Sequence, residues 1–371
     1  MAEIDHLFRD LVQRRASDLH LSSGRKPVIR VNGDMMPLEG PVRNEGDILK
    51  LVREIMPERV RREFEETHDS DFGYEIPGVA RIRANVFRER MGVAGVFRLV
   101  PAEITPPEQL GVPACVTDLC SLSKGLVLVT GPTGSGKSTT LASLTDVINR
   151  NRSGHIVTIE DPIEFVHADK KCLVTHREVY SHTASFAKAL RAALREDPDV
   201  ILVGEMRDLD TIEMTITAAE TGHLVFATLH TSSAPGTVDR IVDSFPAERQ
   251  NQVRTMLADC LRASVSQRLC KRRGGGRVAA FEVMLVNRAV SSLIREGKVH
   301  QIPSAMQMAR SQGMLLLNDS LLKLVAEGVV EPREAYLKSV DRKGLLALFE
   351  ESGVPTRNLQ PGAEWLDEGA V

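Results

Sequence analysis

The stretch GLVLVTGPTGSGKSTTLASLTDVI, residues 125–148, decides the fold class. Gly131 to Ser138 match the pattern G-x-x-x-x-G-K-[ST], with an apolar strand expected before it and a helix after it. Glycines there let backbone N–H groups close around a phosphate, and the helix N-terminus adds partial positive charge. Lys137 is expected to reach the β- and γ-phosphates, and the Ser138 hydroxyl is a ligand for Mg²⁺. The stretch predicts a nucleoside-triphosphate site formed by Gly131, Pro132, Thr133, Gly134, Ser135, Gly136, Lys137, Ser138 and Thr139.

The sequence on either side of this stretch predicts more than one domain. At 371 residues the chain is long for a single compact domain. Residues 101–111, PAEITPPEQLG, are rich in proline and favour neither a helix nor a strand. After them, apolar strands alternate with longer helical patterns, as in an α/β domain with a largely parallel sheet. We expect an N-terminal domain over 1–100, a linker over 101–112, a nucleotide-binding core over 113–286, a helical region over 287–352 and a loosely ordered tail over 353–371.

The stretch VILVGEMRD, residues 200–208, predicts a second buried strand of this core, but its end lacks the usual acid. In most P-loop enzymes an aspartate at this point holds Mg²⁺. Here Gly204 takes that place, and the first acid is Glu205. Because Glu205 stands one residue further out, we expect it to act on Mg²⁺ through the water shell of the ion.

A cluster of acids follows another expected strand, in HIVTIEDPIEF, residues 155–165. Pro162 prevents a regular helix or ladder there, so Glu160, Asp161 and Glu164 are expected on a loop. Ligands of a parallel α/β sheet lie beyond the carboxyl ends of its strands, where this loop emerges. Glu164 is therefore a candidate for orienting the attacking water. Solvent-exposed acids without a catalytic role are the alternative.

Histidines bracket a further apolar strand in HLVFATLHT, residues 223–231. A strand leading to Thr228, His230 and Thr231 resembles a sensor that feels the γ-phosphate and passes the state on, and His223 is counted with this sensor group. Packed or hydrogen-bonded histidines are the alternative, since a histidine more often has that role.

Composition narrows the function classes. Formal net charge is −3, and neither half of the chain is basic, which argues against a protein held to nucleic acid by phosphate attraction. The five cysteines form no C-x-x-C pair, so no structural zinc site is expected. No apolar run is long enough to cross a bilayer, and the first fifteen residues lack the apolar core of a secretory signal. We expect a cytoplasmic protein.

Four motifs in this order, GPTGSGKST, TIEDPIEF, VILVGEMRD and TGHLVFATLHT, resemble the Walker A, Asp, Walker B and His boxes of the type II/IV secretion ATPase superfamily. The stretches ASDLHLSSG (16–24), RIRANVFRER (81–90), VSQRL (265–269) and LIREGKVHQI (293–302) are similar to its pilus-retraction branch, the PilT-type twitching-motility ATPases. The likeness covers roughly residues 3–350, most of the chain.

The resemblance implies a fold and a set of roles. A PAS-like α+β N-terminal domain would be followed by a RecA-like P-loop ATPase domain with a helical C-terminal region, six copies forming a ring with ATP at the subunit boundaries. The Asp-box glutamate that matches Glu164 would be the catalytic carboxylate, and the atypical Walker B ending Gly-Glu matches Glu205. Ring ATPases also bring arginines from a neighbouring subunit, and the family's N-domain strands place Arg83 and Arg98 in that role. Arg207, near the Walker B strand, and Arg195 are the alternatives, and Arg207 also joins the sensor group.

One motif departs from the family. Retraction ATPases usually carry AIRNLIRE, a signature needed for movement but not for nucleotide binding. Residues 289–296 read AVSSLIRE, with Ser291 and Ser292 in place of Arg and Asn. The change leaves room for a specialised paralogue. The basic stretch RLCKRRGGGR (268–277) is either a solvated turn or a contact with acidic lipid or a partner.

Taken together, the sequence predicts a hexameric Mg-ATP-hydrolysing motor at the cytoplasmic face of a bacterial inner membrane. It would move a membrane platform protein and withdraw pilin subunits, alone or with a paralogous retraction ATPase. A pilus-assembly or secretion ATPase is the first alternative, disfavoured because such enzymes commonly carry a four-cysteine zinc module. A RecA-like nucleic-acid motor is weakened by near-neutral charge and only 4% aromatic residues. A non-hydrolysing ATP-bound scaffold is the third.

Overall fold

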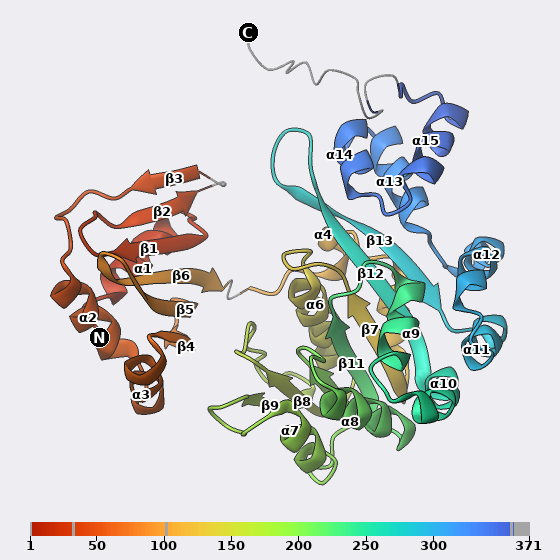
Figure 1. Ribbon diagram of the computed structural model, residues 1–371, viewed down its shortest axis with the longest axis horizontal. Coiled ribbons are helices and arrows are strands. Elements are labelled where there is room, and N and C mark those ends of the chain that lie inside the picture. The colour runs from red at the N-terminus through yellow and green to blue at the C-terminus, as the bar shows by residue number, and fades with distance from the viewer. Residues whose placement is uncertain (1, 32–33, 101–102, 357–358, 360–371) are drawn as a thin grey trace. The chain divides into compact units, whose positions relative to one another are not determined.

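The computed structural model describes residues 2–31, 34–100, 103–356 and 359. The chain divides into two compact units (Figure 1). The first comprises Met1–Ile104 together with Pro162–Val166, and the second comprises Thr105–Asp161 and His167–Val371. The segment Pro162–Val166 therefore belongs to the first unit, although the residues before and after it belong to the second.

The first unit is an antiparallel sheet of six strands with three helices. The strand order is β3-β2-β1-β6-β5-β4. Its strands are β1 (Asp18–Ser22), β2 (Val28–Val31), β3 (Asp34–Pro37), β4 (Asp69–Ile76), β5 (Ala80–Glu89) and β6 (Gly92–Val100), and its helices are α1 (Asp5–Gln13), α2 (Glu45–Ile55) and α3 (Glu58–Thr67). Residues in β5 alternate between buried and half-buried, so one face of the sheet packs on the core and the other carries polar side chains.

Helix α1 joins this core through an apolar stripe. Leu7, Phe8 and Leu11 recur at helical spacing and are all buried. The Phe8 ring packs against Phe97 of β6, with 5.4 Å between ring centroids. The opposite face of the sheet holds a cross-strand row in which Arg83 of β5 pairs with Arg98 of β6 and Arg98 pairs with Asp18 of β1.

The second unit is built on a sheet of seven strands, ordered β13-β12-β7-β11-β10-β8-β9. Every neighbouring pair is parallel except β12 and β13, which form an antiparallel hairpin. The strands are β7 (Gly125–Thr130), β8 (Gly154–Glu160), β9 (Cys172–Glu178), β10 (Val200–Val203), β11 (Leu224–Leu229), β12 (Leu261–Lys271) and β13 (Arg277–Leu285). The largely parallel sheet predicted from the sequence is confirmed.

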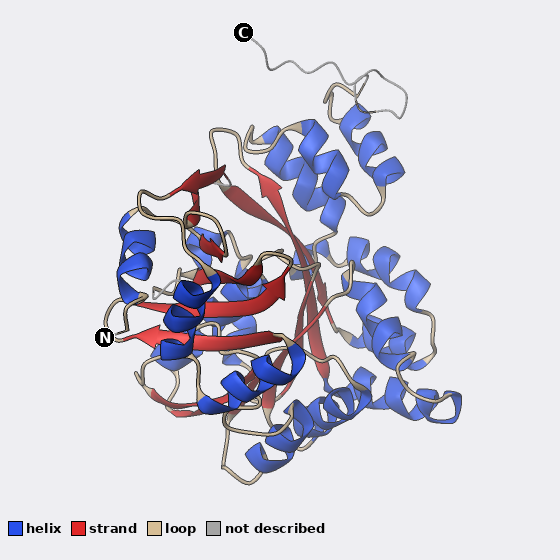
Figure 2. Cartoon of the chain, turned by 60° about the vertical axis from the view of Figure 1, so that its left-hand side comes forward, coloured by secondary structure: helices blue, strands red, loops and turns tan. Residues whose placement is uncertain are grey.

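Helices cover both faces of this sheet, which explains why the central strands are apolar without alternation (Figure 2). One core lies under α7, α8, α9 and α10, and the other lies under α5 and α6. The helices are α4 (Pro107–Leu110), α5 (Ala114–Asp118), α6 (Lys137–Asn151), α7 (Phe186–Ala193), α8 (Leu209–Glu220), α9 (Ala234–Val242) and α10 (Ala247–Cys260), with a 3₁₀ turn at Leu119–Ser121.

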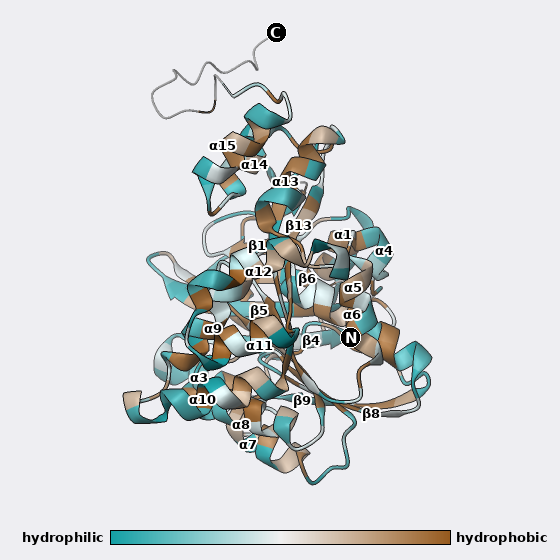
Figure 3. Cartoon of the chain, turned by 90° about the vertical axis from the view of Figure 1, so that its right-hand side faces the viewer, coloured by the Kyte–Doolittle hydropathy of each residue, from teal (hydrophilic) through white to brown (hydrophobic). Residues whose placement is uncertain are grey.

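A group of helices follows β13. It comprises α11 (Arg288–Arg295), α12 (Ile302–Met308), α13 (Leu317–Ala326), α14 (Pro332–Lys338) and α15 (Arg342–Glu351), with 3₁₀ turns at Val299–Gln301 and Arg310–Gln312. Helices α13 to α15 share a core with Cys270 of β12 and Ala280 of β13, so the β12–β13 hairpin is also the base of the C-terminal helices. Teal and brown alternate around these helices in Figure 3, as expected of amphipathic helices.

The expected linker at 101–112 differs from what the structure shows. Residues 101–102 lie outside the described part of the chain, and from Thr105 onward the chain belongs to the second unit. Helix α4 forms within the supposed linker because Pro107 stands in its first turn, where proline is tolerated. The Ser143 hydroxyl of α6 also donates a hydrogen bond to the Thr105 carbonyl at 2.7 Å. Of the expected loose tail over 353–371, residues 357–358 and 360–371 lie outside the described part of the chain.

A membrane-crossing helix needs both length and apolar content, and no helix in the described ranges has both.

Candidate nucleotide site

The phosphate cradle lies between β7 and α6. Its glycines Gly131, Gly134 and Gly136 have φ of 142°, 76° and 89°, a region that other residues rarely adopt. A Cβ at Gly131 would also collide with the side chain of Ser135 and with the backbone of β12. The loop is thus folded tightly enough to turn its backbone amides inward at the start of α6, as phosphate binding requires.

Lys137, the first residue of α6, is folded back over this loop. Its side chain is buried, with 9% exposed, and Nζ donates to the carbonyls of Gly131 at 2.9 Å and Pro132 at 3.2 Å. Nδ1 of His230 lies 3.4 Å from the same Nζ. The ammonium group therefore sits over the cradle, where a bound phosphate would compete for it.

Glu205 lies at the centre of an ionic network beyond the strand ends. One carboxylate oxygen is 2.8 Å from the Arg207 guanidinium and the other is 2.7 Å from Nε2 of His230. Burial alone would raise the pKa of Glu205, but the hydrogen bond and charge of Arg207 and the charge of His230 outweigh it, and the net pKa is lowered. The hydrogen bond with Glu205 in turn raises the pKa of Arg207. Glu205 is held ionised.

The glycine at 204 has a packing reason. A Cβ there would lie 3.2 Å from the Ile159 carbonyl oxygen and 3.3 Å from Cα of Glu160, closer than ordinary van der Waals contact. The end of β10 is pressed against β8 at this point, and the Gly204 N–H donates to the same Ile159 carbonyl at 2.8 Å. An aspartate at 204 would need β8 to shift by a few tenths of an ångström, and Glu205 supplies the carboxylate one residue later.

Thr228 fastens β11 to the segment after β10. Its hydroxyl donates to the Gly204 carbonyl at 2.5 Å, and the Met206 N–H donates to the Thr228 carbonyl at 3.1 Å. A displacement of His230 at the end of β11 would therefore also move Glu205, through the backbone contacts of Thr228 and through the ion pair between His230 and Glu205. This arrangement suits the predicted sensor positions Thr228 and His230.

The structure does not bring His223 to the cradle. His223 precedes β11 and His230 follows it, so they lie at opposite ends of the strand. Its Nδ1 contacts the Ala218 carbonyl at 2.9 Å and the Thr221 hydroxyl at 3.4 Å, both at the end of α8. The expected sensor role of His223 does not fit this position, and the histidine serves to close the turn between α8 and β11.

Arg83 and Arg98, the two arginines predicted to act on a neighbouring subunit, each have a carboxylate partner within their own chain. The Arg83 guanidinium is 3.4 Å from Glu164, and Arg81 donates to the Ile163 carbonyl at 3.0 Å. Arg98 is 2.9 Å from the buried carboxylate of Asp18. The roles of Glu164, Arg83 and Arg98 in catalysis stay predictions.

The chemistry of the cradle fits Mg²⁺, which takes few protein ligands and completes its shell with phosphate and water oxygens. Ser138 lies in the first turn of α6 and is half-buried, and Glu205 follows the carboxyl end of β10. In the part of the chain that the structure describes, no group of three or more histidines, cysteines and acids is arranged as a metal cage.

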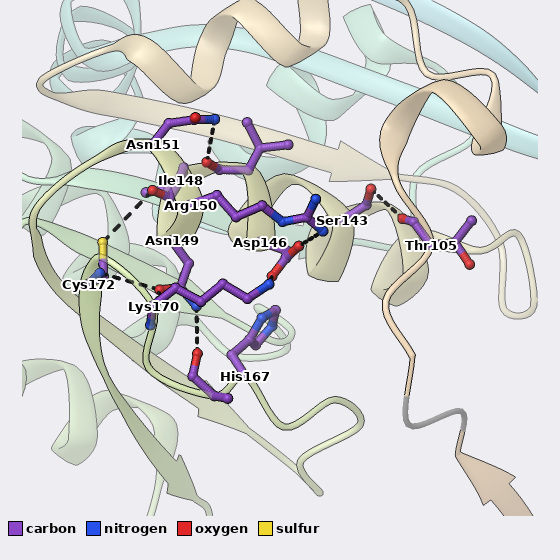
Figure 4. Close-up of polar contacts among 12 residues, drawn as sticks. Thr105, Ser143, Asp146, Ile148, Asn149, Arg150, Asn151, His167, Lys170 and Cys172 are labelled. Atoms are coloured by element: carbon purple, nitrogen blue, oxygen red, sulfur yellow. Dashed lines mark hydrogen bonds and ion pairs between the residues drawn. The ribbon is translucent and has the colours of Figure 1, made fainter.

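Sequence reasoning missed a second polar cluster, which holds the chain between β8 and β9 against α6 (Figure 4). Asp146 of α6, with a side chain 3% exposed, forms ion pairs with Arg150 and Lys170. Burial raises the pKa of Asp146, but the hydrogen bonds from Lys170 and Arg150 lower it by more. The amide of Asn149 bonds the backbone of residues 168, 170 and 172. These contacts fix the segment that follows the Asp box.

His167 belongs to this cluster and is nearly fully buried. Its ring stacks on His176 with 5.9 Å between centroids, and its backbone N–H donates to Nε2 of His176 at 3.1 Å. Burial, and secondarily the charge of His176, lower the pKa of His167 to about 4. The side chain is therefore neutral at physiological pH.

Comparison with known proteins agrees with the geometry. A family described as type II/IV secretion system protein matches residues 2–340. The chain belongs to this family. Among its relatives, the type IV pilus retraction ATPase PilT of Pseudomonas aeruginosa is 51% identical over 337 residues, covering 91% of this chain and 98% of the relative. PilU of the same organism, a type IV pilus ATPase, is 38% identical and covers 90% of this chain and 87% of the relative.

Solved structures place the chain in the same family. A crystal structure of the pilus retraction motor PilT with bound ADP has a TM-score of 0.86 and 48% identity, covering 94% of this chain and 99% of that one. The ATPase DotB of Legionella pneumophila has a TM-score of 0.77 and 27% identity, covering 90% and 94%. The predicted family and fold class are thereby confirmed, and the chain is a P-loop ATPase of the type II/IV secretion family.

Proposed function

We propose that this ATPase is a hexameric motor that uses Mg-ATP to power retraction of a type IV pilus. The observation that carries the proposal is 51% identity to a retraction ATPase along almost the full length of both chains. The motor would work at the cytoplasmic face of the inner membrane, where it would move a pilus platform protein.

Each polar residue of the nucleotide site would have a separate role. The ammonium group of Lys137 donates to the carbonyls of Gly131 and Pro132. With ATP bound, it would donate to the β- and γ-phosphates instead. Ser138 would hold Mg²⁺ directly and Glu205 would hold it through water. The ion supplies charge neutralisation at the phosphate oxygens.

Glu164 would orient and polarise the attacking water. A carboxylate in this role contributes about 10²–10⁴ in rate. Its contact with Arg83 holds the carboxylate beside a cation.

Arg83 and Arg98 would reach the γ-phosphate of a neighbouring subunit. An arginine supplied in this way is worth about 10³–10⁵ in rate. Both side chains lie on one face of the first unit's sheet in directly paired positions, so they would be presented together. Arg207 and Arg195 are the alternative arginines for this role. Arg207 forms an ion pair with Glu205 of its own chain, and Arg195 is exposed.

ATP binding and hydrolysis would change the angle between the two units across PAEITPPEQLG, residues 101–111. Around a ring, that change would turn the platform protein and withdraw pilin subunits. His230 and Thr228 would pass the state of the γ-phosphate to the end of β10 through the contacts described above.

An accessory retraction ATPase that works beside a paralogue is the second candidate. The observation that favours it is the altered signature in α11. Ser291 donates to the Ala258 carbonyl of α10 at 2.9 Å, and Ser292 donates to Glu296 at 3.0 Å. Both serine hydroxyls are thus engaged within this chain, Ser291 with α10 and Ser292 at the C-terminal end of α11.

The proposal is tested by imaging fluorescently labelled pili in cells whose single retraction-type ATPase is this chain. Retraction events with the wild-type chain, and none with Lys137→Ala, support it. Equal retraction in both strains would refute an ATP-driven role for this chain. If this chain supports retraction only in a second strain that also carries a paralogue, the accessory role is correct.

A further inference from the structure

Gln267 is a buried polar residue for which the site described above has no role. It lies in β12 and is 1% exposed. Strand β12 runs parallel to β7, with Ser266 opposite Thr130, so Gln267 is level with the first residue of the phosphate loop. A polar amide in this position must be hydrogen-bonded to offset its burial.

Both ends of the Gln267 amide are bonded to the phosphate cradle. Nε2 donates to the carbonyl of Ser135, in the loop, at 2.5 Å. Oε1 accepts from the hydroxyl of Thr140, in the first turn of α6, at 2.8 Å. Because the Thr140 hydroxyl occupies the acceptor end, the NH₂ end is directed at the loop. One side chain thus ties the loop to the helix that follows it.

The bond to Ser135 sets the direction of a backbone amide. In a trans peptide the C=O and N–H groups point in opposite directions. With the Ser135 carbonyl drawn toward β12, the N–H of Gly136 points away from β12. A Cβ at Gly136 would lie 2.9 Å from Nε2 of Gln267, so the loop is also packed directly on this side chain.

We infer that Gln267 is a positioning residue of the phosphate cradle, and that it sets nucleotide affinity by holding the Ser135–Gly136 peptide in the orientation that binds phosphate. The inference rests on the proposed binding of ATP to this loop. A loop released from Gln267 would have to be ordered by the nucleotide itself, and that ordering would reduce affinity.

The test compares Gln267→Met with the wild-type chain in Mg-ADP titrations and in steady-state ATP hydrolysis. Methionine keeps the length of the side chain and removes both hydrogen bonds. We expect Kd for Mg-ADP and KM for ATP to rise at least tenfold, while kcat changes less than threefold. Thr140→Val removes only the hydrogen bond to Oε1 of Gln267, and it is expected to raise Kd for Mg-ADP about threefold.

Ser320→Ala is the matched control. The Ser320 hydroxyl accepts a hydrogen bond from the N–H of Phe281, the residue of β13 directly opposite Gln267, at 3.0 Å. Its loss should lower the melting temperature without changing Kd. If Gln267→Met or Thr140→Val is folded and binds Mg-ADP with the wild-type Kd, the inference is wrong. If Gln267→Met does not fold, Thr140→Val alone decides it. Failure of the wild-type chain to bind Mg-ADP would instead refute the proposed function.

Discussion

Replacing His167 with phenylalanine should remove an acid-sensitive step from the stability of the second unit. His167 is 5% exposed, and its pKa is lowered from 6.5 to about 4 by burial and by the neighbouring His176. Asp146 and Lys170 are the other charged groups that act on it, with opposite effects. A folded-state pKa below the unfolded value means that the neutral form stabilises the fold. That stability is complete above pH 6.5 and is lost as the pH falls toward 4.

The size of the effect follows from the shift. About 2.5 pH units correspond to about 3 kcal/mol, and about 2 kcal/mol of this should be lost between pH 7 and pH 5. Phenylalanine keeps a flat ring against His176 and does not titrate, so its free energy of unfolding lacks this component.

Urea denaturation followed by circular dichroism at pH 7, 6 and 5 measures the difference. The wild-type chain should lose about 2 kcal/mol more than His167→Phe over this range. Hydrogen exchange should place the added loss in β8, β9 and α6. Parallel pH profiles for the two proteins would refute the argument that a buried neutral histidine controls this region.

Further predictions concern the network and the cluster. Asp146→Asn leaves two cations on a buried amide and should destabilise the second unit by about 3 kcal/mol in urea titrations at pH 7. Because the pKa of Asp146 is lowered, its contribution is present above pH 4 and is lost only below it, so Asp146→Asn should flatten the stability profile below pH 4 rather than between pH 7 and 5. Glu205→Gln should lower kcat about 10–100-fold in a phosphate-release assay, because it removes the charge proposed to hold Mg²⁺ through water; an unchanged kcat would exclude it from the reaction. Thr228→Val should cost about 1 kcal/mol of stability, since it leaves the Gly204 carbonyl without its hydroxyl donor; a more stable variant would contradict this.

The phosphate cradle could be predicted because its determinants are local. Strand, glycine loop and helix follow one another within 125–148, and each glycine has a backbone reason. The meeting of Lys137, Glu205 and His230 was also foreseeable, because the carboxyl ends of neighbouring parallel strands share one edge of a sheet.

What the sequence could not supply depends on contacts between distant segments. Gln267 reaches the loop only because β12 pairs with β7, a pairing across more than a hundred residues that no local pattern specifies. The packing of β10 on β8 that leaves little room for a side chain at 204 also depends on two distant segments. The cluster around Asp146 depends on the path of a loop without regular structure.

The position of His223, away from the phosphate cradle, could have been predicted from the sequence. Strand residues advance about 3.3 Å each, so two residues on either side of a six-residue strand are roughly 20 Å apart. His223 and His230 could not both face one phosphate.

The measurement that tests the central claim most directly is a count of surface pili on cells whose only copy of this chain carries Glu164→Gln. Glu103→Gln, an exposed glutamate outside the site, is the control. The account predicts more pili than wild type and no twitching motility for Glu164→Gln, with the control unchanged. Cells without pili would mean that the motor extends the pilus, and the account would be wrong.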